Sequence, residues 1–171
     1  MKKSELIKII GSLALIAAAV VLYLKLRPTR ESQNGSAYFY DLQEKKLFVA
    51  PQGSIPPING INGINGAAGE GVRAIIVSPS GDASDKKNFQ IAYLEEYTPE
   101  VKELFEEVHK ARLEGRSEEG RINRKEVAAN TLVRRIGDSD WQPINSPQGK
   151  IIANEWNNPG PDGKMPVVCS P

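Results

Sequence analysis

Hydrophobic and polar positions divide the chain into one long apolar stretch and, after it, a series of short alternating segments. The long stretch covers residues 9–24, contains no charged side chain and is flanked by Lys8 and Lys25. As a helix rising ~1.5 Å per residue it reaches about 24 Å, and the apolar residues on either side extend it toward the ~30 Å hydrocarbon core of a bilayer. The pattern therefore predicts an N-terminal transmembrane helix, with the membrane anchor within residues 1–27.

The side chains expected to form this anchor are Ile9, Leu13, Leu15, Ile16, Val20, Val21, Leu22, Tyr23 and Leu24.

A cleaved signal peptide and a buried soluble helix are the alternatives for this segment. Lys2 and Lys3 would be the basic start of a signal peptide, but the small residues 17–19 lie inside the apolar stretch, where a cleavage site does not fit. Basic residues precede and follow the stretch in similar number, so charge alone leaves the orientation open. A short tail ahead of a long domain favours a cytoplasmic N-terminus and an extracytoplasmic C-terminal domain.

Small residues share one face of the predicted span. Gly11, Ala14 and Ala18 are spaced at i, i+3 and i+7, and such residues allow a second helix to approach closely. They are candidates for a helix–helix contact, either with a partner or with a second copy. Small residues are also common in spans that make no such contact, so this alternative stays open.

The remainder of the chain is expected to be a linker, residues 28–36, followed by one small domain, residues 37–171. The formal net charge is +1, so no basic surplus supports nucleic-acid binding. One histidine, His109, and one cysteine provide too few ligands for a zinc site. We therefore expect no metal and no cofactor.

Short β-favouring runs in this domain predict an antiparallel sheet. Residues 38–42 and 47–50 are separated by a polar turn, which is typical of a β-hairpin. Residues 72–77 and 89–94 form a second pair, the latter alternating apolar and polar side chains.

The main helix is predicted at residues 99–114. Thr98 suits the N-cap and Pro99 the first helical position. An apolar stripe at i, i+3, i+4 and i+7 predicts a helix packed on one face of the sheet. The stripe consists of Val101, Leu104, Phe105 and Val108.

The C-terminal third is less uniform. Residues 131–136 and 141–144 predict another hairpin, with one continuous helix ending at Ile136 as the alternative. Ser146-Pro147 favours the start of a short helix, and residues 165–169 favour a last strand. Together these elements predict an α+β fold, with a small antiparallel sheet and one main packed helix.

Residues 58–71 form a Gly/Asn-rich loop in which Ile-Asn-Gly occurs three times. We interpret it as a flexible surface loop, with an exposed contact as the alternative. Its glycines do not form a phosphate-binding loop, because a strand rather than a helix follows and no lysine is in place.

The single cysteine, Cys169, lies three residues from the C-terminus. It is either a small apolar residue of the last strand or, outside the cytoplasm, a thiol that cross-links two copies.

Several segments resemble a set of uncharacterised bacterial single-span membrane proteins with a small extracytoplasmic domain. The resemblance covers most of residues 38–156 and implies no function, because that set has no assigned activity. Its segments are Tyr38-Phe39-Tyr40-Asp41, Leu47-Phe48, Ile55-Pro56-Pro57-Ile58, Gly71-Val72-Arg73-Ala74, Tyr93-Leu94-Glu95-Glu96-Tyr97-Thr98, and Trp141 with Asn145-Ser146-Pro147. The layout is also similar to that of pilins, although no acidic residue follows Gly11 at their characteristic spacing.

No catalytic constellation is identified in the sequence, so we expect a membrane-anchored, non-catalytic interaction or structural module, for example an accessory subunit of an envelope complex. Its partners would be the bilayer and a membrane or envelope protein. Tyr38, Tyr40 and Trp141 are the candidates for partner contact, although each also suits a core. A pilin- or secretion-associated subunit is the first alternative, and a small-ligand binder or enzyme is the second.

Overall fold

The structure is a computed structural model, and it describes residues 35–63, 69–117, 122–160 and 162–171. The predicted anchor (residues 1–27) and most of the predicted linker lie outside the described residues. Residues Gly35–Pro171 form one compact unit, and the first strand already begins at Ser36, the last residue assigned to the linker. Among the described residues, none of the helices combines the length and the apolar character that crossing a membrane requires.

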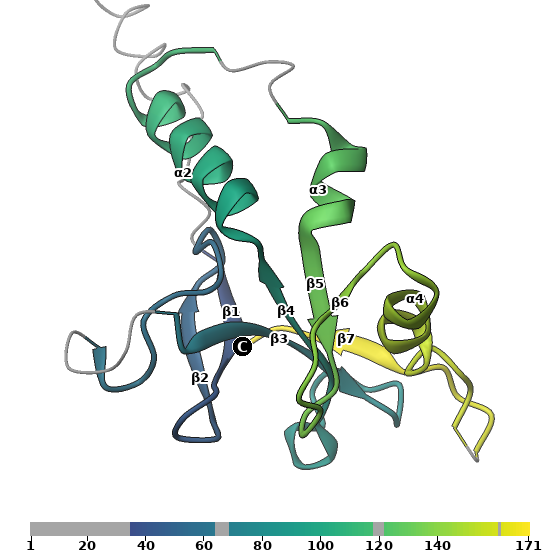
Figure 1. The fold of residues 1–171 in the computed structure, drawn as a ribbon. Helices are drawn as coiled ribbons and strands as arrows, with labels where there is room; N and C mark the ends of the chain where they lie inside the picture. Colours follow the sequence, from purple (N-terminus) through teal and green to yellow (C-terminus); the bar gives the residue numbers. More distant parts are fainter. Residues whose placement is uncertain (1–34, 64–68, 118–121, 161) are drawn as a thin grey trace, which may run out of the picture. The chain divides into compact units, whose positions relative to one another are not determined.

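The described unit is built on one antiparallel sheet of seven strands (Figure 1). The strand order is β2-β1-β3-β4-β5-β6, with β7 paired to β3. The strands are β1 (Ser36–Asp41), β2 (Lys46–Pro51), β3 (Gly71–Ser78), β4 (Gln90–Tyr97), β5 (Thr131–Arg134), β6 (Gln142–Pro143) and β7 (Val167–Cys169).

The central strand, β3, has three neighbours because two of them share one edge. It pairs with β1 through residues 71–73 and with β7 through residues 76–78, while β4 follows its other edge. The register to β4 shifts between Ile75 and Ile76, which is a β-bulge. The C-terminal strand therefore lies in line with the N-terminal strand, next to the middle of the sheet.

Side chains alternate between two faces of the sheet, which we call the Tyr40 face and the Arg73 face. On the Tyr40 face, one buried cluster contains Tyr40, Val72, Ala74, Ile76, Leu94 and Cys169. On the Arg73 face, a row of directly opposed residues crosses four strands through Phe39, Arg73, Glu95 and Val133. Phe39 and Val133 are fully buried, so both faces contribute to the core.

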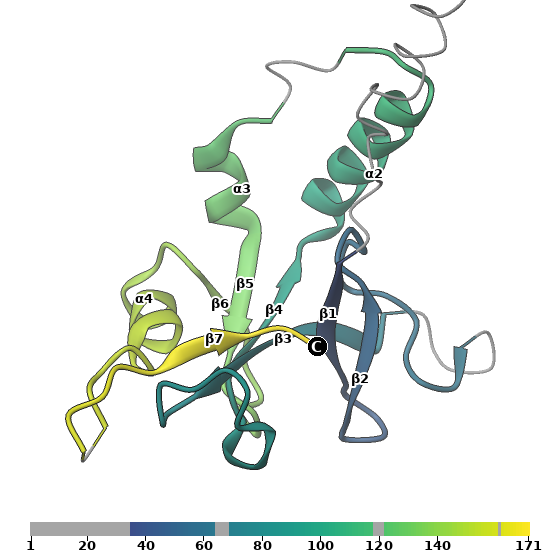
Figure 2. The same cartoon turned by 180° about the vertical axis from the view of Figure 1, so that it is seen from behind.

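Two helices connect β4 to β5. Figures 1 and 2 show α2 (Pro99–Leu113) and α3 (Arg124–Asn130) beyond the ends of these strands. Thr98 and Asn130 join the bases of the two helices: the Thr98 N–H donates to the Asn130 carbonyl (3.0 Å), and the Thr98 hydroxyl donates to the Asn130 side-chain oxygen (3.3 Å).

The prediction of a helix at 99–114 is confirmed, but its expected position on a face of the sheet is wrong. α2 continues from the end of β4, and its first residue follows Thr98 directly. Three of its residues are buried, Val101, Val108 and Ala111. The apolar stripe was correctly identified, but a stripe predicts only that one side of a helix is covered and does not specify the element that covers it.

The C-terminal elements follow the sequence expectations. β5 begins directly after α3, so the alternative of one continuous helix to Ile136 is wrong. Earlier in the chain, between β3 and β4, lies a short 3₁₀ helix (Lys86–Asn88). Helix α4 (Pro147–Asn154) starts after Ser146, whose hydroxyl accepts the Gly149 N–H at 3.0 Å.

Gly149 lies close to β6 at the start of α4. A Cβ at this position would overlap the Pro143 carbonyl group. We expect Gly149→Ala to lower the free energy of unfolding by about 1–3 kcal/mol, the usual cost of inserting a methyl group into tightly packed backbone. Chemical denaturation followed by circular dichroism measures this change. Lys150→Ala, one residue along the same helix and exposed, is the control; equal stability of both variants would contradict the packing described here.

Candidate interaction surface

The three predicted contact residues all belong to the Tyr40 face. Tyr40 is only 9% exposed and lies in the buried cluster, so its side chain packs in the core and is not available at the surface. Tyr38 and Trp141 are partly buried and pack against the rim of the same cluster. Tyr38 also contacts Phe89 edge to face, with 6.4 Å between ring centroids.

Arg134 covers Trp141. Its guanidinium carbon lies 4.5 Å from the centroid of the indole ring, which is a cation–π arrangement, and its Nη1 donates to the Asp138 carbonyl at 3.2 Å. Glu96, on the neighbouring strand, has a pKa raised by burial, and the positive charge of Arg134 partly offsets that increase. Arg134 therefore holds Trp141 in place and presents a charged, aromatic pair at this side of the sheet.

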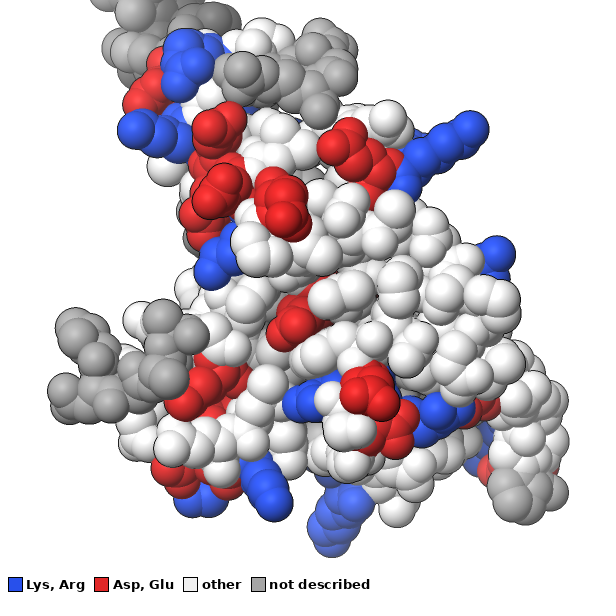
Figure 3. Space-filling view, viewed as in Figure 1, with Lys and Arg blue, Asp and Glu red and all other residues white. Residues whose placement is uncertain are grey.

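At the β2 end of the same Tyr40 face, the exposed side chains are apolar. Leu47 and Val49 on β2 lie across from Tyr40 and Tyr38 and are 43% and 53% exposed. In Figure 3 uncharged residues cover most of the sheet, while acidic side chains gather over α2. We define the candidate interaction surface by the members of this face that reach the surface, Tyr38, Leu47, Val49, Arg134 and Trp141.

On the Arg73 face, the Arg73 side chain binds the segment that follows β2. The Arg73 guanidinium lies 5.9 Å from the centre of the Phe39 ring. Its Nη2 donates to the carbonyl groups of Gln52 (3.0 Å) and Ser54 (3.2 Å). The segment that leaves β2 is thereby fixed across this face of the sheet.

Glu95 occupies the centre of the same face, between Tyr93 and Tyr97 along β4. Burial raises the pKa of Glu95, and the charge of Arg73 opposes that change. Burial and the nearby Glu95 charge raise the pKa of Tyr93 to about 12 and also raise the pKa of Tyr97. Among the described residues, none donates a hydrogen bond to the Glu95 carboxylate, so its ionised form is poorly compensated.

Asp41, at the end of β1, is fully buried and accepts three backbone hydrogen bonds. Its Oδ1 accepts from the N–H groups of Gln43 (2.9 Å) and Glu44 (2.8 Å), and its Oδ2 accepts from Ile61 (2.7 Å). Burial alone would raise the pKa of this carboxyl, but these three N–H groups and the Lys46 charge hold it below its ordinary value.

The same carboxylate attaches the Gly/Asn-rich loop to the sheet. Gly60 lies directly against the Asp41 carboxylate, where any Cβ would overlap it, and Asn62 donates from its amide to Glu44 (2.9 Å). The two ends of the loop are joined by reciprocal hydrogen bonds between Ile58 and Gly71. The described ends of the loop are therefore attached to the sheet, and the interpretation as a flexible loop stays a prediction; residues 64–68 lie outside the described part.

The remaining candidates from the sequence are Cys169, a metal site and the anchor residues. Cys169 is buried in β7, and burial raises the pKa of its thiol, which donates to the Val167 carbonyl (3.5 Å). A disulfide between copies would require β7 to open, and it stays a prediction.

The described residues contain no group of three or more His, Cys, Asp or Glu side chains placed to hold a metal. The predicted anchor residues and Gly11, Ala14 and Ala18 lie outside the described part.

A shallow depression of about 250 Å³ lies between the β5–β6 turn and α4. It is lined by Asp138, Ser139, Asp140, Gln142, Gln148 and Ile152. Nearby in the sequence, Arg135 forms a two-point ion pair with Glu155, donating from Nε to Oε1 at 2.6 Å and from Nη2 to Oε2 at 2.5 Å. This pair ties the end of β5 to the end of α4.

Comparisons with known proteins bring no relative. No family model, no curated protein and no solved structure matches the chain. The resemblance to uncharacterised single-span proteins therefore stays a prediction.

Asp41→Asn tests the role of the buried carboxylate. An amide offers one acceptor oxygen in place of two, so at least one of the three N–H groups loses its partner. We expect a loss of about 1–3 kcal/mol in unfolding free energy at neutral pH. Because the pKa of Asp41 is lowered by folding, the wild-type advantage is present above the ordinary aspartate pKa and disappears as pH falls through the folded value. Asp140→Asn, an exposed carboxyl, serves as the control in the same denaturation series; a constant difference between Asp41→Asn and wild type at all pH values would contradict this assignment.

Glu95→Gln is expected to act in the opposite direction. Folding raises the pKa of Glu95, so the stability that its neutral form provides is lost as pH rises through the folded value. Glutamine remains neutral, and the variant should be slightly more stable than wild type at neutral pH and equal to it in acid. Thermal unfolding between pH 4 and 8 measures the difference, with the exposed Glu103→Gln as the control. Lower stability of Glu95→Gln at neutral pH would show that attraction to Arg73 outweighs the cost of burial.

Proposed function

We propose that the protein is a membrane-anchored interaction or structural module. Residues 1–27 would hold it in the bilayer, and the α+β domain would contact a membrane or envelope protein as an accessory subunit. The observation that carries the proposal is the uncharged apolar stretch of residues 9–24 between Lys8 and Lys25, directly ahead of a folded domain. Such a stretch is long enough to span a bilayer when its flanking lysines extend to the interfaces.

The arrangement of the domain supports an interaction role. The buried Asp41 and the partly buried Arg73 bind backbone groups of the same chain and so support loops. At the surface, the Trp141–Arg134 pair offers the residue types that are enriched in protein interfaces. The exposed Leu47 and Val49 provide apolar area on the other side of the same face.

Anchoring would also raise the effective concentration of the domain toward partners in the same membrane. Two tethered proteins meet within a thin layer, so a modest contact area gives substantial occupancy. The proposal therefore does not require a large or deeply apolar interface on the domain.

Membrane extraction with alkaline carbonate tests the anchor. We expect the full chain to stay in the membrane pellet with an intact N-terminus, as read by mass spectrometry. Leu15→Lys combined with Val20→Lys should shift the protein into the soluble fraction, because each charge costs about 2.5–3.5 kcal/mol at the centre of a span. Val168→Lys, an exposed position in the domain, is the matched control. Complete release of the wild-type chain from the pellet would contradict the proposal, and so would a mature protein that lacks residues 1–24.

A further inference from the structure

β2 leaves one long edge of the sheet open. In the part of the chain that the structure describes, β2 is the last strand in the order, and no strand pairs with its outer side. The opposite edge is protected: β6 has two residues, includes Pro143, and is covered where Gly149 of α4 meets it. β2 has six residues and exposes Leu47 and Val49, which is the type of edge that pairs with another strand.

The hydrogen-bond pattern identifies which backbone groups this edge presents. The Gln52 N–H donates to the Gly35 carbonyl at 2.9 Å, and Gly35 and Gln52 continue the register of the β1–β2 pair. In an antiparallel pair, every second residue exchanges hydrogen bonds with its direct partner. Phe48 and Ala50 therefore point their N–H and C=O groups toward β1. The N–H and C=O groups of Leu47 and Val49 point outward.

The pairing of β1 with β3 gives the same alternation. The Leu42 N–H donates to the Glu70 carbonyl at 2.9 Å, so the even-numbered residues of β1 face β3 and the odd-numbered residues face β2. The assignment of Leu47 and Val49 as outward-facing thus rests on two independent hydrogen bonds.

We infer that two copies of the chain pair through their β2 edges, antiparallel about a two-fold axis at Phe48. In this register Leu47 of one copy lies opposite Val49 of the other, and the reverse. The outward N–H and C=O groups of these residues then form four hydrogen bonds between the copies. The two sheets become one continuous sheet.

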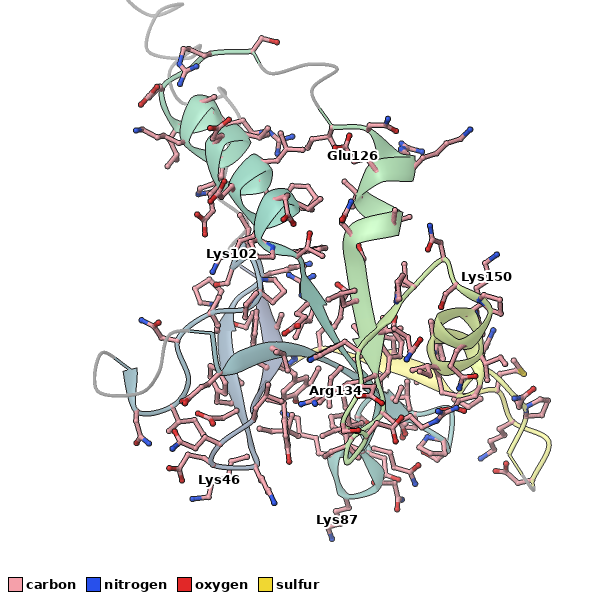
Figure 4. The ribbon with its side chains drawn as sticks, viewed as in Figure 1. Lys46, Lys87, Lys102, Glu126, Arg134 and Lys150 are labelled. Carbon is pink, nitrogen blue, oxygen red and sulfur yellow. The ribbon has the colours of Figure 1, made fainter. Side chains whose placement is uncertain are left out.

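The strand is complementary to itself in side chains as well as in backbone. The Leu47–Val49 pairs are apolar and lie on the Tyr40 face, while the two Phe48 rings meet on the Arg73 face. Lys46 lies at the outer end of the β1–β2 hairpin (Figure 4), and in this register it faces Ala50 of the other copy. The two lysines therefore stay far apart, and no like charges oppose each other. This complementarity favours a second copy over an unrelated strand.

Site-specific cross-linking tests the register in the full chain, in mild detergent and with Cys169→Ala to remove the native thiol. Phe48 faces its own equivalent as a non-hydrogen-bonded pair, with Cα atoms about 4.5 Å apart, which suits a disulfide. The Lys46 equivalents would be roughly 14 Å apart. With copper phenanthroline as the oxidant, Phe48→Cys should form covalent dimer at least about tenfold faster than Lys46→Cys. Equal rates would overturn the inference.

A second measurement does not depend on replacing Phe48. Analytical ultracentrifugation should show a monomer–dimer equilibrium for the full chain, and Val49→Lys should weaken it by at least roughly tenfold, because it places two charges against Leu47. Val168→Lys is the matched control, since Val168 is a 55% exposed valine on another strand. A chain that remains monomeric, or a Val49→Lys variant that dimerises like wild type, would overturn the inference. The inference concerns the domain and does not depend on whether residues 1–27 enter a bilayer.

Discussion

The buried carboxylate of Asp41 joins two parts of the chain that are about twenty residues apart, and the layout of the sheet depends on it. Oδ1 closes the turn between β1 and β2, and Oδ2 holds the first residues of the loop that leads to β3. A buried carboxylate is costly unless its oxygens are satisfied, so turn and loop must adopt these positions together. The β1–β2 hairpin is consequently fixed against β3 on one side, and its other strand becomes the outer edge.

Charged groups elsewhere in the domain divide into those that tie segments of the chain together and those that remain available for contact. Arg73 secures the segment after β2 across one face, and Arg135 with Glu155 ties α4 to the end of β5. Arg134 instead lies over Trp141 at the surface. This division leaves two features available for contact: the Tyr40 face with its aromatic rim, and the open edge of β2. A tether at the N-terminus would bring both to partners held in the same membrane.

The sequence predicted elements whose signals are local. The structure confirms the β1–β2 hairpin, the pairing of residues 72–77 with 89–94, the start of α2 at Pro99 and the cap at Ser146, which all follow from patterns in neighbouring segments. The sequence did not predict that β3 also pairs with β1 and β7, because these pairings join segments far apart in the chain. The run Tyr38-Phe39-Tyr40 is apolar throughout, so its pattern did not reveal that Phe39 and Tyr40 are buried while Tyr38 lies at the rim.

The candidate site was predicted only in part for the same physical reason. Tyr38 and Trp141 were identified by residue type, whereas the contribution of Arg134 depends on a turn that folds Trp141 back beneath it. The role of Asp41 could not be derived, because an aspartate before a polar turn is typical of an ordinary turn residue. Its contact with Ile61 depends on a loop that the sequence indicated only as irregular.

In the proposed dimer, this domain keeps one sheet edge available for a second copy beside a membrane. Hydrogen exchange of backbone amides, measured on the full chain in liposomes at low and high protein density, tests it most directly. The amides of Phe48 and Ala50 bond to β1 and should be protected at both densities. We predict that the amides of Leu47 and Val49 become protected only at high density. Free exchange of these two amides at every density, with Phe48 and Ala50 protected throughout, would contradict it.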